Sequence, residues 1–463
     1  MKKTEATYYL VVGLGRSGLS TAKFLHSKGF GVKATDIDPA RKILEPELNE
    51  LGIETQVGFH DQETFDRASC LVVSPGIPLE IPHIKKARAK GVKITGELDI
   101  FARYNTTPVV AITGTNGKTT TTTLIRDMLE SSGVSTFMGG NIGTPLLDYL
   151  MKNSPVQVVV AEISSFQLDL AHEFHPQVAV LLNLAPDHLD RYPDFSAYEE
   201  SKWSIFKNQT PEDHAIINRD IPGFDARRPT IVAGLYPFSS DSLTGTRAGA
   251  AVEGNRVCLA MGQDAGERTV EIPCQDLEGL PGPHNRENLA AAALASLCRG
   301  ATLKGILSSL TRFKGLPHRI SLVREINQVK FYNDSKATNT GAVIRALETF
   351  AHDCPRKNII LILGGREKGE DFSVLIPAIN KWVRLILAMG EAAPHIQKTF
   401  GPVCPVEEQG TMAHAVLASF RAGRPGDVVL LSPACASFDM YDNYEQRGDD
   451  FVRRVRGLGG GNG

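Results

Sequence analysis

The stretch Val109-Val-Ala-Ile-Thr-Gly-Thr-Asn-Gly-Lys-Thr-Thr120 decides how the middle of the chain folds. Its first five residues, Val109–Thr113, are largely β-branched, as is typical of a buried strand in a parallel sheet. Residues 114–117 contain two glycines and make a tight turn where side chains would obstruct a close-lying ligand. Lys118 then opens a helix that extends toward Leu129. The pattern predicts a strand, a turn and a helix in succession.

This succession is typical of a phosphate-binding loop, in which backbone N–H groups and the positive end of the helix face an anion. Lys118 would place a point charge at the outer phosphates, and the Thr119 hydroxyl would be a ligand for Mg²⁺. The general pattern has glycine six positions before the lysine, where this chain has Ile112. We expect ATP as the ligand. The alternative is an ordinary strand-to-helix turn with a surface lysine.

The composition is ordinary for a globular protein. A chain of 463 residues exceeds one typical core and predicts two or three domains. Apolar residues make up 42% and charged residues 22%, and the net charge of −2 does not favour a large nucleic-acid or anionic-membrane surface. The seven cysteines are scattered without a C-x-x-C pair, which is typical of reduced thiols in a cytosolic protein.

The two ends of the chain carry little structural signal. Lys2 and Lys3 are soon followed by Glu5, and the apolar stretch from Tyr8 reaches a glycine turn, so we expect no secretory signal. No apolar run approaches the roughly 20 residues of a membrane span. These features predict a soluble cytoplasmic protein. The last seven residues, 457–463, are mostly glycine and predict a disordered tail.

The N-terminal part has the pattern of a nucleotide-binding domain. A strand at Tyr8–Val12 runs into the G-x-G-x-x-G of Gly13, Gly15 and Gly18, and a helix follows. A second strand ends at Asp36, where an acidic residue would reach a ribose. Alone, this pattern favours a dinucleotide. Another strand ends in Pro75-Gly-Ile-Pro78, at the sheet edge where open α/β sheets bind ligands. We expect a nucleotide or sugar nucleotide here; a scaffold without one is the alternative.

Acidic and imidazole side chains follow the central strands. After a link at Asn105-Thr-Thr-Pro108, one strand ends at Glu162, which is well placed to hold Mg²⁺ unless it is a solvated carboxylate. The next strand leads to His188, flanked by Asp187 and Asp190. Because the carboxyl ends of parallel strands share an edge, we expect His188 and Glu162 to lie beside the phosphate loop.

Two further features of the central part leave alternatives open. Lys202 lies among acids at the expected start of a helix, near Tyr198, where a solvated surface charge is the normal interpretation. Asn285 and Asn288 share one helix face and would bond a purine edge, or equally cap the helix. Residues 212–275 alternate short apolar runs with Gly, Pro and Asp, and predict a scaffold with one hairpin near residues 251–259.

A third α/β unit begins near Pro317. We expect its strands at 330–333, 358–363, 385–388 and 428–431. Each strand ends in a polar or glycine-rich turn. Four such turns on one sheet edge predict a ligand-binding rim.

Several strings together resemble a known family. The strings are Gly114-Thr-Asn-Gly-Lys-Thr-Thr120, Glu162-Ile-Ser-Ser165, Asn183-Leu-Ala-Pro-Asp-His188, His284-Asn-Arg-Glu-Asn288 and Leu316-Pro-His-Arg319. In this order they resemble the Mur ligases, the ATP-dependent amino-acid-adding enzymes of peptidoglycan synthesis, over essentially the whole chain. The resemblance implies three α/β domains: a Rossmann-like UDP-substrate domain (1–98), a P-loop-type ATP domain with a mostly parallel sheet (99–316) and a Rossmann-like amino-acid domain (317–463).

A second set of strings is similar to the family member that adds D-glutamate. The strings are Ser74-Pro-Gly-Ile-Pro78, Asp334-Ser-Lys-Ala-Thr-Asn339, Leu431-Ser-Pro-Ala-Cys-Ala-Ser-Phe438 and Glu445-Gln-Arg-Gly448. The implied partners are ATP, UDP-N-acetylmuramoyl-L-alanine and D-glutamate. We expect no nucleic-acid partner and no membrane span, and we expect the protein to be a monomer.

The resemblance also implies the residues of each site. Those for the UDP substrate are Gly13, Leu14, Gly15, Arg16, Ser17, Asp36, Ile37, Gly76, Asn141, Ser164 and His188. Those for ATP are Gly114, Thr115, Asn116, Gly117, Lys118, Thr119, Thr120, Asn285, Asn288, Arg319 and Asp334. Those for D-glutamate are Lys336, Thr338, Lys368, Ser437, Phe438 and Tyr444, the last standing where the family often has Phe. The catalytic residues are Lys118, His188 and Lys202.

The implied chemistry is an acyl-phosphate ligation. The substrate carboxylate attacks the γ-phosphate of ATP, and the amine of D-glutamate then displaces phosphate. Two Mg²⁺ ions are implied, with Thr119, Glu162, His188 and Lys202 as ligands. Lys202 is similar to a lysine that the family carbamylates; a carbamate accepts a metal bond that an ammonium would repel. Closure of the C-terminal domain would assemble the site and exclude water.

Three other functions compete. An NAD-dependent oxidoreductase would use residues 13–18 but leaves Lys118, Glu162 and His188 unexplained. A non-enzymatic nucleotide-sensing scaffold would bind ATP without turnover. Folylpolyglutamate synthetase-like ligases share the ATP chemistry, but the N-terminal G-x-G-x-x-G domain argues against them.

Overall fold

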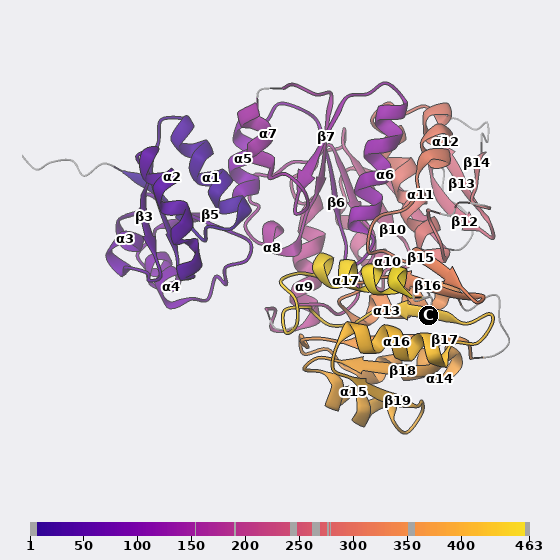
Figure 1. Cartoon of the computed structure of the whole chain (residues 1–463). Helices are drawn as coiled ribbons and strands as arrows, with labels where there is room; N and C mark the ends of the chain where they lie inside the picture. Colours follow the sequence, from indigo (N-terminus) through magenta and orange to yellow (C-terminus); the bar gives the residue numbers. More distant parts are fainter. Residues whose placement is uncertain are drawn as a thin grey trace, which may run out of the picture.

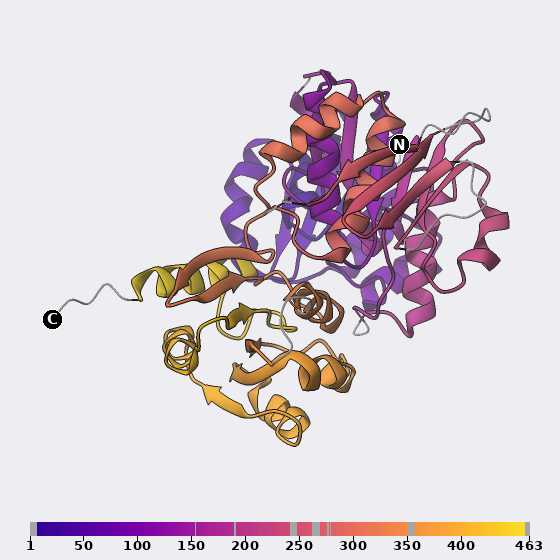
Figure 2. The same cartoon turned by 90° about the vertical axis from the view of Figure 1, so that its right-hand side faces the viewer.

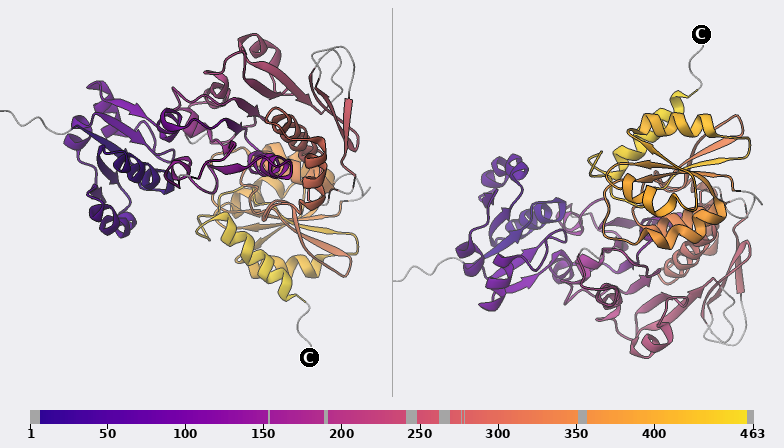
Figure 3. Two further views of the ribbon diagram at one scale, coloured as in Figure 1. Left: turned by 90° about the horizontal axis from the view of Figure 1, so that it is seen from above. Right: turned by 90° about the horizontal axis from the view of Figure 1, so that it is seen from below.

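The computed structural model describes residues 7–152, 154–188, 191–240, 248–261, 269–275, 277, 279–350 and 357–458. In these residues the strands form three sheets, which follow one another along the chain. In Figures 1 and 3 the first sheet, drawn in indigo, lies to one side of the central sheet. The third, in orange and yellow, lies against another side of the central sheet. The expected α/β class with three sheets is confirmed. The domain boundaries at 98/99 and 316/317 stay predictions.

The N-terminal sheet is entirely parallel, with the order β3-β2-β1-β4-β5. Its strands are β1 (Tyr8–Val12), β2 (Gly31–Asp36), β3 (Glu54–Val57), β4 (Cys70–Val73) and β5 (Lys93–Thr95). Its helices are α1 (Arg16–Ser27), η1 (Pro39–Leu44), α2 (Glu45–Glu50), α3 (Gln62–Arg67), α4 (Pro82–Ala89) and α5 (Glu97–Tyr104). The glycine turn therefore connects β1 to α1 as expected.

The central sheet has the order β14-β13-β12-β11-β10-β9-β6-β8-β7 and is parallel from β7 through β12. Its strands are β6 (Val109–Thr113), β7 (Thr136–Gly140), β8 (Val158–Glu162), β9 (Val178–Leu181), β10 (His214–Asn218), β11 (Gly234–Ser239), β12 (Ala248–Glu253), β13 (Arg256–Met261) and β14 (Thr269–Pro273). The expected hairpin is β12–β13, which is antiparallel like β13–β14.

Helices cover both faces of the central sheet. They are α6 (Lys118–Ser131), α7 (Leu146–Lys152), α8 (Ser165–Leu168), α9 (Phe195–Trp203), η2 (Ser204–Phe206), α10 (Phe224–Arg227), η3 (Arg228–Thr230), α11 (Pro283–Leu297) and α12 (Leu303–Arg312). Alternate side chains of β6 enter different cores: Val110 and Ile112 pack with α6 and α11, and Val109 packs on the other face. All five residues of β6 are buried, so the phosphate loop starts from a fixed point.

The C-terminal sheet has the order β15-β16-β20-β17-β18-β19 and is parallel except for β15. Its strands are β15 (Ser321–Ile326), β16 (Val329–Asn333), β17 (Ile359–Gly364), β18 (Val383–Met389), β19 (Val406–Gln409) and β20 (Val428–Leu431). Its helices are α13 (Thr340–Phe350), η5 (Phe372–Leu375), α14 (Ile376–Trp382), α15 (Ala393–Phe400), α16 (Met412–Ala422) and α17 (Tyr444–Gly457). The yellow helix α17 lies against β15 and β16 (Figure 2).

Several local expectations were wrong. Strands β7, β15 and β19 are among those that were not predicted. Two of these edge strands were missed for physical reasons. Strand β15 turns into β16 through Asn327 and Gln328, which are both left-handed without being glycine, and two of the four residues of β19 are glutamates. Residues near Lys202 end helix α9 instead of starting it.

The tail expectation is wrong at Gly457, which closes helix α17. Residues 459–463 and Asp190 lie outside the described residues. Among the residues described, none of the helices combines the length and apolar character that crossing a membrane requires.

The buried β9 generates a stability prediction. Leu181 is fully buried in the core on one face of the central sheet. Leu181→Ala should lower the free energy of unfolding by about 2 to 5 kcal/mol, because it removes buried methyl groups and leaves a cavity. Leu307→Ala makes the same chemical change at a residue that is 36% exposed, and should cost only about 1 kcal/mol. Equal shifts in the thermal unfolding of the two variants would contradict this account of the core.

Candidate active site

The turn between β6 and α6 needs glycine at both ends. Gly117 has a φ of 85°, in the left-handed region, and a Cβ there would lie 2.2 Å from Asn288 Oδ1. Gly114 has a φ of 146°, and its Cβ would press on Leu182 at 3.0 Å. The backbone therefore approaches the neighbouring elements closely and leaves the amides at the start of α6 open to a ligand.

Lys118 folds back over its own turn. Its Nζ donates to the carbonyl oxygens of Gly114 at 2.8 Å and of Thr115 at 2.7 Å. Burial lowers the pKa of this ammonium, while the Glu162 carboxylate opposes that shift. The side chain is thus held at the phosphate loop and is not the free surface lysine of the alternative interpretation.

The Thr119 hydroxyl joins three parts of the site. It donates to Glu162 Oε2 at 2.8 Å and accepts from Arg319 Nη2 at 2.7 Å. Glu162 Oε1 accepts from Asn141 Nδ2 at 2.9 Å, and the residue is only 2% exposed. Glu162 is therefore not a solvated carboxylate. The Thr119 hydroxyl therefore connects the end of β8, the start of α6 and the segment after α12.

These oxygen atoms fit a magnesium ion. A hydroxyl and a carboxylate 2.8 Å apart are hard ligands of the kind that Mg²⁺ takes beside phosphates. Within the described ranges there is no group of three or more His, Cys, Asp and Glu side chains that could hold a metal ion by themselves. An ion here would complete its shell with phosphate oxygens and water.

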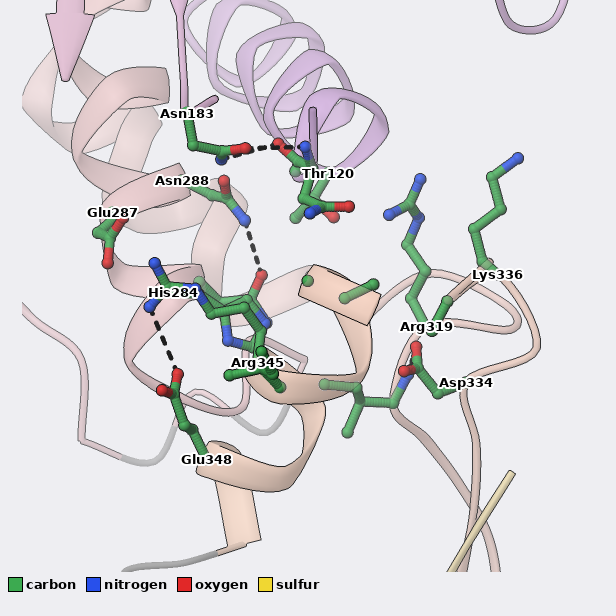
Figure 4. A pocket seen from close by; sticks show the side chains of 18 of the residues that line it. Thr120, Asn183, His284, Glu287, Asn288, Arg319, Asp334, Lys336, Arg345 and Glu348 are labelled. Atoms are coloured by element: carbon green, nitrogen blue, oxygen red, sulfur yellow. Dashed lines mark hydrogen bonds and ion pairs between the residues drawn. The ribbon is translucent and has the colours of Figure 1, made fainter. Parts of the chain in front are cut away.

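A cavity of about 380 Å³ opens between the central and C-terminal parts of the chain. Figure 4 shows Asn288 on the α11 side facing Arg319, Asp334 and Lys336 across it. Asn288 Nδ2 donates to Asn285 Oδ1 at 3.0 Å, and both residues line the cavity. The N-cap of α11 is Gly282, so the capping alternative for the two asparagines is wrong.

Asp334 is buried below this cavity. Its Oδ2 accepts from the Ser432 hydroxyl at 2.9 Å and its Oδ1 from the Ile320 amide at 3.2 Å. Burial raises the pKa of Asp334 to about 7. The carboxyl group therefore ties the turn after β16 to the turn after β20.

Lys202 is the residue that sequence reasoning alone placed wrongly. It is 2% exposed, so the surface-charge interpretation is contradicted. Its Nζ lies 4.7 Å from the centre of the Tyr198 ring. Burial, and then the positive charge of Lys118, lower its pKa well below the usual lysine value. Burial therefore favours the uncharged form of this amine, which lies close enough to Lys118 to feel its charge.

His188 follows strand β9 and lies close enough to Lys118 and Lys202 to feel their charges. It has a left-handed backbone, with a φ of 56°, and its ring packs edge-on to Phe166 at 4.8 Å. Its Nε2 is 3.8 Å from Asp187 Oδ2, and burial lowers its pKa. His188 also lines an open cavity of about 510 Å³ together with Lys368 and Phe438.

The residues expected for D-glutamate divide between two cavities. Lys368 Nζ donates to Thr338 Oγ1 at 3.4 Å, beside the exposed Phe438 in the cavity that His188 lines. Lys336 instead lines the cavity shared with Asn288, and its Nζ stands 3.6 Å from the centre of the Tyr444 ring. Burial lowers the pKa of Lys336 to about 8.

Asn339 makes contacts between the central and C-terminal domains and was not among the predicted site residues. Its Nδ2 donates to Asp187 Oδ2 at 3.1 Å and to Asn116 Oδ1 at 3.3 Å, and its Oδ1 accepts from the Ala342 amide at 2.7 Å. One buried amide thus connects the C-terminal sheet edge to the phosphate loop and to the neighbour of His188. Its place at the end of the string 334–339 was the available signal.

A third cavity, of about 440 Å³, lies at the N-terminal glycine turn. The residues from the sequence analysis that line it are Gly13, Gly15, Arg16, Ser17, Asp36, Gly76 and Asn141. Arg16 donates to the Gly143 carbonyl of the central part.

Four residues expected at the N-terminal site have further interactions or other surroundings, although Asp36 also lines this cavity. Asp36 Oδ2 accepts from the Leu14 amide at 2.6 Å, so this carboxylate holds the glycine turn in place. The Leu14 side chain is itself buried in the core. Ser164 caps helix α8 in a reciprocal pair with Gln167, whereas Ile37 is 57% exposed.

Family models match almost the whole chain. The Mur ligase MurD-like N-terminal domain matches residues 7–96, the Mur ligase middle domain residues 112–296, and the glutamate ligase domain of Mur ligases residues 318–435. Two similar proteins are named UDP-N-acetylmuramoylalanine--D-glutamate ligase. The one from Desulfosudis oleivorans is 42% identical over 98% of this chain and 97% of its own length. The one from Trichlorobacter lovleyi is 42% identical over 97% and 98%.

A solved structure shares the fold. The UDP-N-acetylmuramate-alanine ligase MurC from Thermotoga maritima has a TM-score of 0.59 and 18% identity, over 97% of this chain and 99% of that chain. At this identity the similarity concerns the arrangement of the three sheets and not the ligand.

The crowding at Gly117 generates a prediction for nucleotide binding. In Gly117→Ala the new methyl group would meet Asn288 Oδ1 at 2.2 Å, and the turn would have to shift. We expect affinity for ATP to fall by at least roughly tenfold, the equivalent of about one lost hydrogen bond to a charged group. Titration of the variant with a fluorescent ATP analogue measures this loss.

Gly133→Ala is the matched control. Gly133 also has a φ of 85° and lies at the other end of α6, but nothing stands within 4 Å of its Cβ position. It carries the backbone strain without the clash, and should bind the analogue like the parent protein. Equal loss in both variants would show that strain in α6, and not the contact with Asn288, governs the affinity.

Proposed function

This chain belongs to the Mur ligase family, and we propose that it is the ATP-dependent ligase that joins D-glutamate to UDP-N-acetylmuramoyl-L-alanine in peptidoglycan synthesis. The observation that carries the proposal is the 42% identity with D-glutamate ligases over 98% of the chain. The oxidoreductase alternative falls away, because the glycine turn lies within the match to a Mur ligase N-terminal domain. The same match removes the folylpolyglutamate synthetase-like alternative. A non-enzymatic nucleotide-sensing scaffold is disfavoured because the identity with named ligases extends over 98% of the chain.

ATP would lie in the cavity between the central and C-terminal domains. We assign its phosphates to residues 114–120, of which Asn116, Gly117 and Thr120 line the cavity. The first N–H groups of α6 would face the anion there. Asn285 and Asn288 would bond the purine, Asp334 the ribose, and Arg319 the outer phosphate. The bond from Arg319 to the Thr119 hydroxyl supports this, since it brings a guanidinium to the end of the phosphate loop.

In the first step, a carboxylate oxygen of the alanyl group attacks the γ-phosphorus of ATP. A phosphorus–oxygen bond forms to give an acyl phosphate, and the bond to the β-phosphate oxygen breaks to release ADP. Lys118 and Arg319 would stabilise the charge on the transferring group. The substrate would approach from the His188 side, with its UDP part at residues 13–17, Asp36, Ile37 and Gly76 and its sugar near Asn141 and Ser164.

Thr119 and Glu162 would hold one Mg²⁺, and His188 with carbamylated Lys202 a second; the ions neutralise negative charge when bound. The burial of Lys202 supports the carbamate, because only an uncharged amine attacks CO₂. In that reaction a carbon–nitrogen bond forms at Nζ and one proton leaves. The product is a carboxylate-like ligand in place of a cation.

In the second step, the uncharged amine of D-glutamate attacks the acyl carbon and expels phosphate. Lys368, Thr338, Ser437 and Phe438 would hold the amino acid, and Lys336 and Tyr444 would face it from the ATP side. The shared cavity of His188, Lys368 and Phe438 supports this placement. The sites would belong to domains 1–98, 99–316 and 317–463 of one chain, so we propose a monomer that acts in the cytoplasm.

Phosphate release tests the function and its amino-acid choice. The enzyme is given ATP and UDP-N-acetylmuramoyl-L-alanine, and D-glutamate, L-glutamate or L-lysine is added in turn. We expect release that requires both the nucleotide substrate and D-glutamate. Release with another amino acid instead would refute the D-glutamate choice but keep the family chemistry. No release with any of them would refute the ligase.

Lys202 provides a separate prediction. Lys202→Ala should lower kcat by roughly 100-fold or more, because a ligand that stabilises transition-state charge is lost. Lys207→Ala, at an exposed lysine five residues later, should leave kcat unchanged. Labelling with ¹³C-bicarbonate should give a carbamate signal in the nuclear magnetic resonance spectrum of the parent protein and of Lys207→Ala. A carbamate signal that persists in Lys202→Ala would rule out this site.

A further inference from the structure

Helix α17 carries a buried cation whose hydrogen bonds go to backbone carbonyls and a hydroxyl. Arg447 lies in the first turn of this helix and is 3% exposed. Within the described part of the chain, no ion pair joins it to a carboxylate. Burial lowers the pKa of its guanidinium to about 10, so the group stays charged at neutral pH. A buried charge of this kind destabilises a fold unless its donors are satisfied.

The donors of Arg447 are satisfied by two turns at the edge of the C-terminal sheet. Nε donates to the Ser335 hydroxyl at 3.0 Å, and Nη2 donates to the Ser335 carbonyl at 2.9 Å. Nη2 also donates to the Cys435 carbonyl at 3.1 Å, and Nη1 to the Ala436 carbonyl at 3.3 Å. The planar fork of a guanidinium suits several fixed acceptors, which a lysine ammonium does not match.

The segments that Arg447 connects carry the residues proposed to hold D-glutamate. Ser335 immediately precedes Lys336 in the turn after β16, and Ala436 immediately precedes Ser437 in the turn after β20. The third segment is α17 itself, since Tyr444 stands one helical turn before Arg447. The Ser335 hydroxyl, which accepts from Arg447, donates to the Tyr444 carbonyl at 2.8 Å.

Resting on the proposed function, we propose that Arg447 is the positioning residue of the amino-acid site. Its guanidinium holds the turns 334–339 and 432–438 and the start of α17 at fixed distances. The Asp439 carboxylate acts on this guanidinium through space without pairing with it, so the hydrogen bonds to the two turns are the direct contacts of Arg447. Arg447 acts through the segments that carry Lys336, Ser437 and Tyr444.

Kinetics of Arg447→Lys and Arg447→Met in the full-length enzyme test this inference. The lysine variant keeps the charge and loses the fork; the methionine variant loses both. We expect the KM for D-glutamate to rise roughly tenfold in Arg447→Lys and further in Arg447→Met, as when a charge-assisted hydrogen bond is lost. The KM for UDP-N-acetylmuramoyl-L-alanine, which binds in another domain, should stay within about twofold.

Arg384 provides the matched control. It also lies in the C-terminal domain and is largely buried, and its Nη2 donates to Asp427 Oδ2 at 2.6 Å and to the Ala422 carbonyl at 2.7 Å. Arg384 lies at the N-terminal end of β18, whereas the two turns follow the C-terminal ends of β16 and β20. Arg384→Lys and Arg384→Met should lower the melting temperature without raising the KM for D-glutamate.

Ser335→Ala keeps the test decisive if Arg447→Met does not fold. It removes one acceptor of Arg447 and should raise the KM for D-glutamate about threefold. The inference is overturned if both KM values rise equally in Arg447→Lys, or if Arg384→Lys raises the KM for D-glutamate as much. A parent enzyme without D-glutamate-dependent phosphate release overturns the proposed function. An active parent with unchanged Arg447 variants overturns this inference alone.

Discussion

The active site depends on a backbone that passes too close to its neighbours for any side chain. At Gly117 the chain turns left-handed, and a methyl group there would meet Asn288 Oδ1 at 2.2 Å. This close approach sets the start of α6 against α11, with the first amides of α6 open to the cavity. It also places Thr119 where its hydroxyl reaches both Glu162 and Arg319. The proposed ATP site and the proposed metal ligands are therefore positioned from one turn, which also contacts the C-terminal domain through Arg319.

The second organising feature is the seam between the central and C-terminal domains. Arg319 and Asn339 cross it by hydrogen bonds to Thr119, Asn116 and Asp187. These contacts place the proposed ATP cavity next to the His188 cavity. The proposed reaction requires this, because amide formation follows phosphoryl transfer at the same carboxylate. Within the C-terminal domain, the buried Arg447 ties together the turns that face this seam. Binding energy from two domains is thus directed to one reacting centre.

Much of this arrangement could be predicted from local sequence, and the rest could not for identifiable reasons. The succession of β6, turn and α6 was predicted because a β-branched run, two glycines and Lys118 each favour the same local structure. The edge strands β15 and β19 were missed because partly exposed or charged strands lack a strong apolar pattern. Lys202 resembles a solvated lysine in sequence; its burial comes from packing against distant segments. The same holds for Arg447, whose partners stand about 110 residues earlier and 12 residues earlier.

In the proposed mechanism, the γ-phosphate of ATP passes to the carboxylate of the UDP substrate. The most direct measurement labels both oxygens of the alanyl carboxylate with ¹⁸O and weighs the released phosphate by mass spectrometry. Attack on the γ-phosphorus at the loop of Gly117 and Lys118 predicts phosphate that carries one ¹⁸O, together with unlabelled ADP. Label in AMP, with release of pyrophosphate, would place the attack on the α-phosphorus and contradict the account.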